Sequence, residues 1–179
     1  SEWWALKQIW DKGLLYKGHK VVPYCPRCGT ALSSHEVAQG YKDVKETSAI
    51  AKFKVADQEN TYFLAWTTTP WTLPSNVILS VNAKETYAKA KYQDYYVIMA
   101  EALMDSVLGE GNYEVVERVK GADLEYVKYE PLFDFQPNGE DFKGYFMTCD
   151  DYVTLTDGTG IVHTAYAYGE DDYRVCKKY

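Results

Sequence analysis

The feature of this sequence that most constrains its fold is a long series of short segments rich in β-branched and aromatic residues. Turn-forming stretches, such as DQEN at 57–60 and QD at 93–94, separate these segments. The pattern predicts strands over residues 50–55, 62–66, 77–81, 86–92, 95–99, 113–119, 126–129, 145–148 and 161–163. Many short strands with few helices between them are typical of a closed or nearly closed β-barrel.

Two helices are predicted beside this barrel. Apolar residues from Trp3 to Trp10 recur at helical spacing, and Gly13 marks the end of that helix. A second, short helix is predicted over residues 101–108, ended by Gly109. The predicted fold class is therefore mainly β with peripheral helices, that is, α+β.

The length and the net charge of the chain limit the kinds of function it can have. The chain has 179 residues, 46% of them hydrophobic, so it can bury a core without disulfides. Its net charge of −7 argues against a protein that coats nucleic-acid phosphates across a broad face. That charge is still compatible with a pocket that grips the end of a single strand. We expect an N-terminal helix with a zinc-knuckle-like segment over residues 1–45 and the β-barrel over residues 46–179.

The sequence carries no sign of a membrane or secretory protein. Its longest uncharged stretch, residues 61–83, is rich in Thr, Ser, Asn and Pro and is unsuited to lipid. The chain has neither a signal peptide nor an initiator Met, so we interpret it as a fragment of a longer protein. Its cysteine pattern, one CxxC and two solitary residues, does not resemble a disulfide scaffold and indicates a cytoplasmic setting.

The CxxC, with Cys25 and Cys28 followed by Gly29, has the shape of a zinc knuckle. A structural zinc site needs four ligands, and His19 and His35 are the nearest further candidates. We therefore expect a half-site. A redox role is disfavoured, because no thioredoxin-like βαβ pattern surrounds the motif.

A threonine-rich run, WTTTPWTLPSN from Trp66 to Asn76, is the first candidate for chemistry. Pro70 and Pro74 stiffen the backbone and cannot donate to a ladder, so the run is predicted to leave the sheet after Trp66. Hydroxyls held between two tryptophans suit a small pocket that orients a water or a sugar. The alternative is a threonine-rich strand end with tryptophan in the core.

A second candidate is the glycine-rich turn DGTG at 157–160, which feeds a short strand ending on His163. Asp172 follows nine residues later, where acids favour the start of a helix. A carboxylate near a pocket histidine could hold an ammonium group. The alternatives are a helix-capping acid and a hydrogen-bonded structural histidine.

These runs carry a specific resemblance. AWTTTPWTLPSN and GTGIVH…GEDDY resemble the two signature segments of the isoleucyl-tRNA synthetase editing domain. CPRCGTALSSHEVAQGY resembles the start of that insertion and GADLEYVKYEPLF its middle, so the resemblance covers nearly the whole chain. Valyl and leucyl relatives typically carry Arg before the proline of the threonine motif, whereas Thr69-Pro70-Trp71 is isoleucyl-like. The resemblance implies a β-barrel-like editing domain of class I aminoacyl-tRNA synthetases, inserted as a connective polypeptide.

The resemblance also implies a reaction. One methylene group changes binding by only about 1–3 kcal/mol, and the isoleucine enzyme is itself the usual example of this limit. The resemblance therefore implies a second site that hydrolyses the ester of mischarged Val-tRNA(Ile) after transfer, with pre-transfer editing as an additional activity. The implied partners are the tRNA(Ile) 3′ end carrying valine and the rest of the parent synthetase, with the fragment monomeric. No cofactor is implied for editing, and a structural zinc belongs to the parent enzyme.

The family's functional residues match positions of this sequence one by one. Its catalytic residues fall on Thr67, Thr68, Thr69, His163 and Asp172, and its substrate-binding residues on Trp66, Trp71 and Asn76. The family's aspartate matches Asp172 rather than its neighbour Asp171. The sequence departs from the family at Tyr166, where a proline is usual, so the loop between His163 and Asp172 has its own shape.

Two other functions compete with this one. The chain could be a non-catalytic module that binds the tRNA 3′ end through a zinc-knuckle barrel, or a free-standing trans-editing deacylase. The presence of Thr69, His163 and Asp172 favours the enzyme over the binding module. Because the sequence shows no nucleophile–base motif, we expect hydrolysis by positioned groups rather than by a triad.

Overall fold

The computed structural model describes residues 1–133, 135 and 142–179. The chain divides into two units, residues 1–41 and 42–179, close to the predicted boundary between residues 45 and 46. None of the helices within the described residues is long and apolar enough to cross a membrane.

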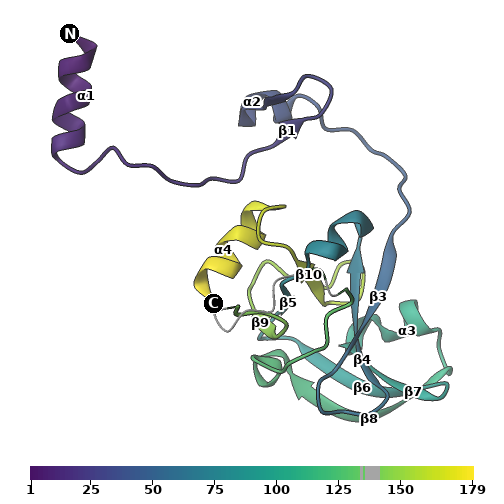
Figure 1. Cartoon of the computed structure of the whole chain (residues 1–179). Coiled ribbons are helices and arrows are strands. Elements are labelled where there is room, and N and C mark those ends of the chain that lie inside the picture. The colour runs from purple at the N-terminus through teal and green to yellow at the C-terminus, as the bar shows by residue number, and fades with distance from the viewer. Residues whose placement is uncertain (134, 136–141) are drawn as a thin grey trace. The chain divides into compact units, whose positions relative to one another are not determined.

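The first unit contains two short helices and a hairpin (Figure 1). Helix α1 spans Glu2–Asp11, and the backbone N–H of Gly13, at φ 70°, donates to Trp10 O over 2.8 Å. The predicted helix and its glycine stop are therefore confirmed. The hairpin pairs β1 (Tyr24–Cys25) with β2 (Thr30–Ala31), and α2 (Ser34–Ala38) follows it.

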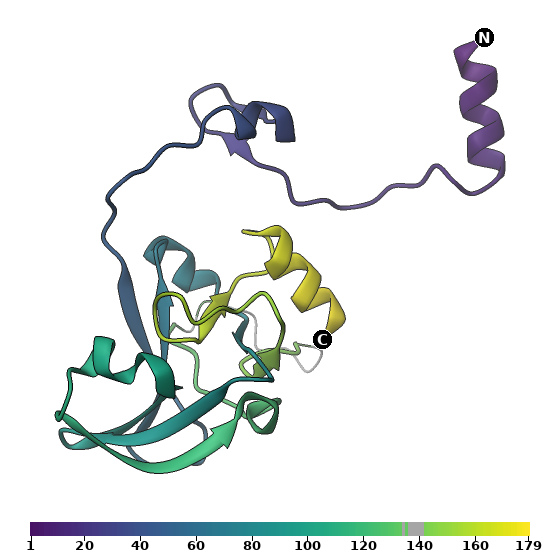
Figure 2. The same cartoon turned by 180° about the vertical axis from the view of Figure 1, so that it is seen from behind.

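The second unit is built on one eight-stranded sheet (Figures 1 and 2). Its strands are β3 (Ala49–Lys54), β4 (Thr61–Thr67), β5 (Ile78–Val81), β6 (Thr86–Tyr92), β7 (Tyr95–Ala100), β8 (Tyr113–Lys120), β9 (Met147–Cys149) and β10 (Val162–Thr164). The strand order is β8-β6-β7-β4-β10-β5-β9, and β3 pairs with β4 off this path. The pairs β4–β7, β4–β10 and β5–β9 are parallel, and the others are antiparallel.

Helical turns surround this sheet. They are the 3₁₀ turns η1 (Pro70–Ser75), η2 (Glu101–Leu103) and η3 (Gly121–Leu124) and the helices α3 (Met104–Leu108) and α4 (Glu170–Lys178). The helix predicted over residues 101–108 is thus split into a 3₁₀ turn and an α-helical turn. Helix α4 lies beside β9 and β10, and α3 lies near β7 (Figures 1 and 2).

Two isolated bridges close the sheet into a barrel. Val55 pairs with Tyr129, and Lys128 pairs with Phe146 just before β9. Backbone hydrogen bonds from Ala56 N–H to Lys128 O and from Met147 N–H to Val127 O, both 2.9 Å, hold this seam together. The ring then runs through β3, the seam, β9, β5, β10 and β4, as expected for the predicted barrel.

The strand predicted over residues 126–129 is wrong as a regular strand. Tyr126 has a positive φ of 65°, which breaks extended pairing, so only Lys128 and Tyr129 form bridges. The two residues that remain paired are the ones that close the ring.

Apolar side chains from alternate strand positions fill the barrel. The main cluster includes Phe53 and Val55 from the β3 side, Phe63 from β4, Leu79 from β5 and Met147 from β9, each fully buried. In β3 the more buried residues alternate with exposed ones, so one face of that strand lies inside, whereas all four residues of β5 are buried. A second cluster packs Met104 and Leu108 of α3 against Leu64, Ala88, Val97 and Met99.

A buried polar contact ties the threonine-rich run to the seam. Asn76, the residue after η1, is 4% exposed; its Oδ1 accepts from the Tyr129 hydroxyl over 2.6 Å and its Nδ2 donates to Ile78 O over 3.0 Å. Both polar groups of this side chain are used inside the protein. Asn76 thus braces the end of η1, while its predicted contact with substrate stays a prediction.

We predict that Tyr129→Phe lowers the free energy of unfolding by about 1–3 kcal/mol, because it leaves the buried Asn76 Oδ1 without its donor. Urea denaturation followed by far-UV circular dichroism measures the loss. Tyr126→Phe is the matched control, since Tyr126 lies on the same segment and is largely exposed. Equal effects of the two substitutions would contradict the bracing role of Tyr129.

Candidate functional site

A chain of threonine hydroxyls begins where β4 ends. Thr67 Oγ1 accepts the backbone N–H of Thr69 over 3.0 Å and lies 3.4 Å from Thr69 Oγ1. Thr69 Oγ1 in turn lies 3.3 Å from Thr72 Oγ1, in the first turn of η1. The prolines that the sequence analysis singled out thus convert a strand end into a turn that stacks three hydroxyls.

His163 completes this chain. It lies in β10, paired with Leu79, and its Nε2 is 2.8 Å from Thr72 Oγ1. The side chain is 7% exposed, and burial lowers the pKa of His163 to about 4, so the imidazole is neutral near pH 7. Its Nδ1 is buried and has no hydrogen-bond partner among the described residues.

Asp172 approaches the same strand end from the first turn of α4. The backbone N–H of Ala165, two residues beyond His163, donates to its half-buried carboxylate. Burial raises the pKa of Asp172 to about 6, with the hydrogen bond from Ala165 opposing the shift. Gly169 leaves room for this carboxylate, because a Cβ there would lie 3.2 Å from Asp172 Oδ2.

Asp171 occupies a different environment from its neighbour. Its side chain is 59% exposed and forms an ion pair with Arg174 over 2.9 Å. Only Asp172 of the two presents a partly desolvated carboxylate. The role that the resemblance implies for Asp172 stays a prediction.

The loop that carries the unusual Tyr166 is tied to α4. The Tyr166 ring lies 5.0 Å from the Tyr173 ring, and Tyr168 N–H donates to Ala165 O over 3.0 Å to form a turn. An aromatic contact therefore anchors this loop to α4.

The two predicted tryptophans do not share a pocket. Trp71 is 70% exposed and lines a recess with Thr68, Pro70 and residues 46–49. Trp66 lines another recess with Tyr152 and residues 154, 156, 157 and 159–162. Thr68 thus lies apart from the hydrogen-bonded chain that joins Thr67, Thr69, Thr72 and His163.

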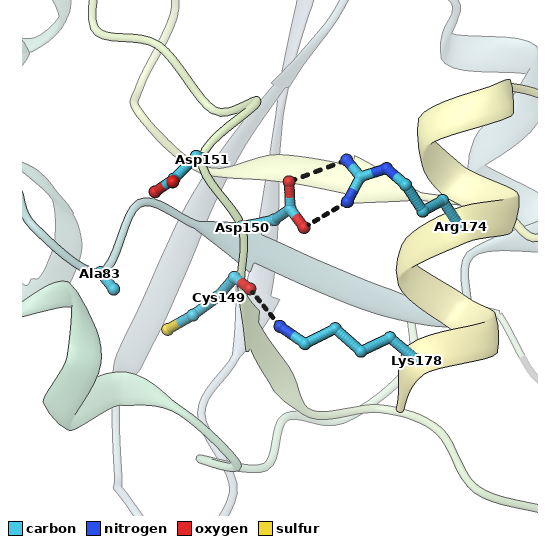
Figure 3. A pocket seen from close by; sticks show the side chains of 6 residues that line it. All are labelled: Ala83, Cys149, Asp150, Asp151, Arg174 and Lys178. Atoms are coloured by element: carbon cyan, nitrogen blue, oxygen red, sulfur yellow. Dashed lines mark hydrogen bonds and ion pairs between the residues drawn. The ribbon is translucent and has the colours of Figure 1, made fainter.

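A third pocket, shown in Figure 3, is polar, and its charged side chains are already engaged in ion pairs or hydrogen bonds within the protein. Arg174 on α4 forms a bidentate pair with Asp150 at 2.7 and 2.8 Å, and Lys178 Nζ donates to Cys149 O over 3.4 Å. Burial raises the pKa of the Cys149 thiol to about 11, which leaves it protonated and unreactive near neutral pH. This pocket contains none of the predicted site residues.

Cys25 and Cys28 lie in the first unit, at the hairpin formed by β1 and β2. Cys28 N–H lies 3.4 Å from Cys25 Sγ, and this bond with others from Cys28 and Arg27 lowers the pKa of Cys25. A lowered thiol pKa suits a metal ligand. No cluster of three or more His, Cys, Asp or Glu ligands occurs within the described part of the chain, so these residues supply only half of a zinc site. Zinc binding here stays a prediction.

Thr72 is a member of the hydrogen-bonded chain that the sequence pattern did not predict. It belongs to the threonine-rich run, and its spacing of three residues from Thr69 is the spacing of one 3₁₀ turn. The two prolines were therefore a usable signal for a turn that brings Thr69 and Thr72 together.

The arrangement can position polar atoms but holds no strong base. Among the described residues no carboxylate bonds to the ring of His163, and threonine hydroxyls are not bases near neutral pH. The groups present can orient a water and a carbonyl, while the ionised Asp172 can hold a cation.

Comparisons with known proteins show what this chain is similar to. A family model of tRNA synthetases class I (I, L, M and V) matches residues 1–153. The chain is 61% identical over 180 residues to the isoleucine–tRNA ligase of Clostridium tetani and 55% identical over 175 residues to that of Bacillus thuringiensis. These alignments cover 100% and 98% of this chain but only 17% of each relative.

Solved structures resemble the fold at lower identity. The structure titled GlLeuRS-CP1 superposes with a TM-score of 0.61 at 18% identity and covers 74% of this chain and 59% of that one. The cytosolic leucyl-tRNA synthetase editing domain of P. knowlesi gives 0.58 at 15% identity, covering 74% and 65%. The mainly β fold is therefore shared with synthetase editing domains.

We predict that Asp172→Asn raises the free energy of unfolding above pH 6 and leaves it nearly unchanged below about pH 4. The folded pKa of about 6 exceeds the ordinary value of 3.8, so ionisation favours the unfolded chain between these pH values. Asparagine keeps an acceptor for Ala165 N–H and removes the charge. Urea titrations at pH 4 and pH 8 measure the difference from the unsubstituted chain.

Asp171→Asn provides the control for this experiment. Asp171 is exposed and paired with Arg174, so its loss should destabilise slightly, with the opposite sign. A loss of stability in Asp172→Asn of the same size at both pH values would show that burial of the Asp172 charge is not the cause.

Proposed function

The chain belongs to the tRNA synthetases class I (I, L, M and V), and on that premise we propose that it hydrolyses the ester of tRNA(Ile) mischarged with valine. The observation that carries the proposal is the hydrogen-bonded chain from Thr67 and Thr69 through Thr72 to the neutral His163. Such a site offers hydroxyls and an aromatic wall without a strong nucleophile. An aminoacyl ester is already activated, so positioning is sufficient chemistry for its hydrolysis.

Asp172 is the proposed partner of the α-ammonium group. Its pKa of about 6 leaves it mostly ionised near pH 7, and a half-buried carboxylate gives a charge-assisted hydrogen bond in a partly dry setting. Asp171 is less suited to this role, because its carboxylate is already paired with Arg174.

Thr69 is the proposed group nearest the reacting water and ester carbonyl. Its hydroxyl lies between those of Thr67 and Thr72, and Pro70 follows it directly in the chain. A hydroxyl held on both sides keeps its orientation through the reaction, so a lone pair on its oxygen can orient the attacking water without reorganisation.

His163 is the proposed limit on side-chain size. With a pKa of about 4 it is a weak base near neutral pH, which favours a role as a wall over a role as general base. Its burial and its bond to Thr72 hold the ring in place. A stiff wall of this kind resists the extra methylene of isoleucine.

The exposed Trp71, beside Thr68, is the proposed stacking surface for the tRNA 3′ end. Trp66, which lines the second recess, and Asn76, which braces the end of η1, are the proposed supports of the site. The chain spans 17% of the length of its curated relatives, so the rest of an isoleucine–tRNA ligase is a proposed partner too. We place this function in the cytoplasm, with the isolated chain monomeric.

Thr69→Val tests the proposed function directly. The substitution keeps the branched shape and removes the hydroxyl, so single-turnover deacylation of Val-tRNA(Ile) should slow by about 10²–10³-fold while tRNA binding changes little. The assay uses this chain alone and within the whole ligase. Thr86→Val, a surface change on β6, is the control and should retain the parental rate. If neither protein deacylates Val-tRNA(Ile) before substitution, the binding-module function replaces this proposal.

His163→Ala should extend hydrolysis to correctly charged Ile-tRNA(Ile), because a smaller side chain leaves room for one more methylene. We expect the discrimination between Val-tRNA(Ile) and Ile-tRNA(Ile) to fall by about tenfold or more. His35→Ala, in the first unit, should leave it unchanged. Loss of Val-tRNA(Ile) hydrolysis with no gain on Ile-tRNA(Ile) would instead assign His163 a catalytic role.

A further inference from the structure

We propose that Thr72 is a positioning residue that fixes His163 in its Nε2–H tautomer and thereby leaves Nδ1 as a buried acceptor. The structural part of this inference stands on the contacts of Thr72 alone. Its consequence for editing rests on the proposed function.

The direction of the Thr72–His163 bond follows from proton counting. A threonine hydroxyl has one proton to donate, and Thr72 Oγ1 lies 2.7 Å from Thr69 O, a carbonyl that can only accept. Because that proton is committed to Thr69 O, Thr72 Oγ1 must accept from His163 Nε2, which is 2.8 Å away. The proton of the neutral imidazole therefore resides on Nε2.

The other ring nitrogen is then a lone-pair acceptor. Nδ1 of His163 is buried and finds no partner among the described residues, although buried polar atoms are nearly always paired. A buried acceptor left unpaired in this way suits an ordered water, the usual partner of such an atom inside a protein. With the other tautomer, Nδ1 would be a donor, and Nε2 would face an oxygen whose proton is already used.

The fold keeps Thr72 in place for this task. Thr72 is 6% exposed, and its backbone N–H also donates to Thr69 O over 3.0 Å, so one carbonyl fixes both its main chain and its hydroxyl. Pro70 and Pro74 lie within the same η1 turn, and Asn76 anchors its end. The Thr72 hydroxyl is consequently a fixed reference for the ring.

A purely steric role is the competing explanation, and two substitutions separate it from ours. Thr72→Val keeps the branched shape of the side chain and removes the hydroxyl, whereas Thr72→Ser keeps the hydroxyl and removes the methyl group. Positioning by the hydroxyl predicts a defect in Thr72→Val and near-normal behaviour in Thr72→Ser. A purely steric role predicts a defect in Thr72→Ser and near-normal behaviour in Thr72→Val.

The first experiment needs no tRNA. In ¹⁵N-labelled chain, imidazole NMR resolves the three histidines, and His163→Asn assigns the signals of His163 by their disappearance. We expect one Nε2–H tautomer with a slowly exchanging Hε2 proton in the unsubstituted chain and in Thr72→Ser. In Thr72→Val, the Hε2 proton should exchange quickly. An Nδ1–H tautomer in the unsubstituted chain, or an unchanged Hε2 signal in Thr72→Val, would overturn the proposal.

The second experiment measures the consequence. In the whole ligase, Thr72→Val should raise hydrolysis of Ile-tRNA(Ile) relative to Val-tRNA(Ile) by up to about tenfold, the effect of one hydrogen bond, and Thr72→Ser should not. If only Thr72→Ser raises the hydrolysis of Ile-tRNA(Ile), the positioning role is wrong and the Thr72 methyl group acts sterically. If the unsubstituted ligase deacylates neither tRNA, the proposed function has failed, while the NMR result still decides the tautomer.

Discussion

Barrel closure at a short seam of backbone contacts over residues 126–130 is the constraint on which the rest of this structure depends. The bridges at Tyr129 and Lys128 join the end of β3 to the start of β9 and complete a ring that none of the longer ladders completes. The same Tyr129 reaches through its hydroxyl to Asn76 and so fixes the end of η1. Since η1 carries Thr72, the seam is linked to the hydroxyl chain through two side chains.

Burial then sets the charge of the site. It acts in opposite directions on an acid and a base, raising the pKa of Asp172 to about 6 and lowering that of His163 to about 4. Between pH 4 and pH 6 both side chains are mainly neutral, and above pH 6 the ionised Asp172 gives the site one negative charge. A cationic ammonium group is the complement of that state, and a neutral imidazole adds no repulsion against it.

The sequence predicted the parts of this molecule that local pattern controls. The strand over Thr86–Tyr92 has the predicted bounds, and the departure of the chain from the sheet before Pro70 was readable from the prolines. The contact between Thr72 and His163 was not, because 91 residues separate them and only the pairing of β10 with β4 and β5 brings them together. The separation of Trp66 and Trp71 was equally hidden, since the 3₁₀ turn between sheet and loop decides which recess each side chain lines.

The five tryptophans of this chain differ in exposure, and this difference determines what its intrinsic fluorescence reports. Trp3, Trp4, Trp10 and Trp71 are 62–81% exposed, so their emission already resembles that of an unfolded protein. Trp66 alone is partly enclosed: a Cβ on Gly158 would lie 2.8 Å from its indole ring, and its main chain bonds to Ile161. A change in emission on denaturation therefore reports chiefly on one indole, at the contact between β4 and the chain leading into β10. Quenching by a soluble agent, in contrast, would report chiefly on the other four.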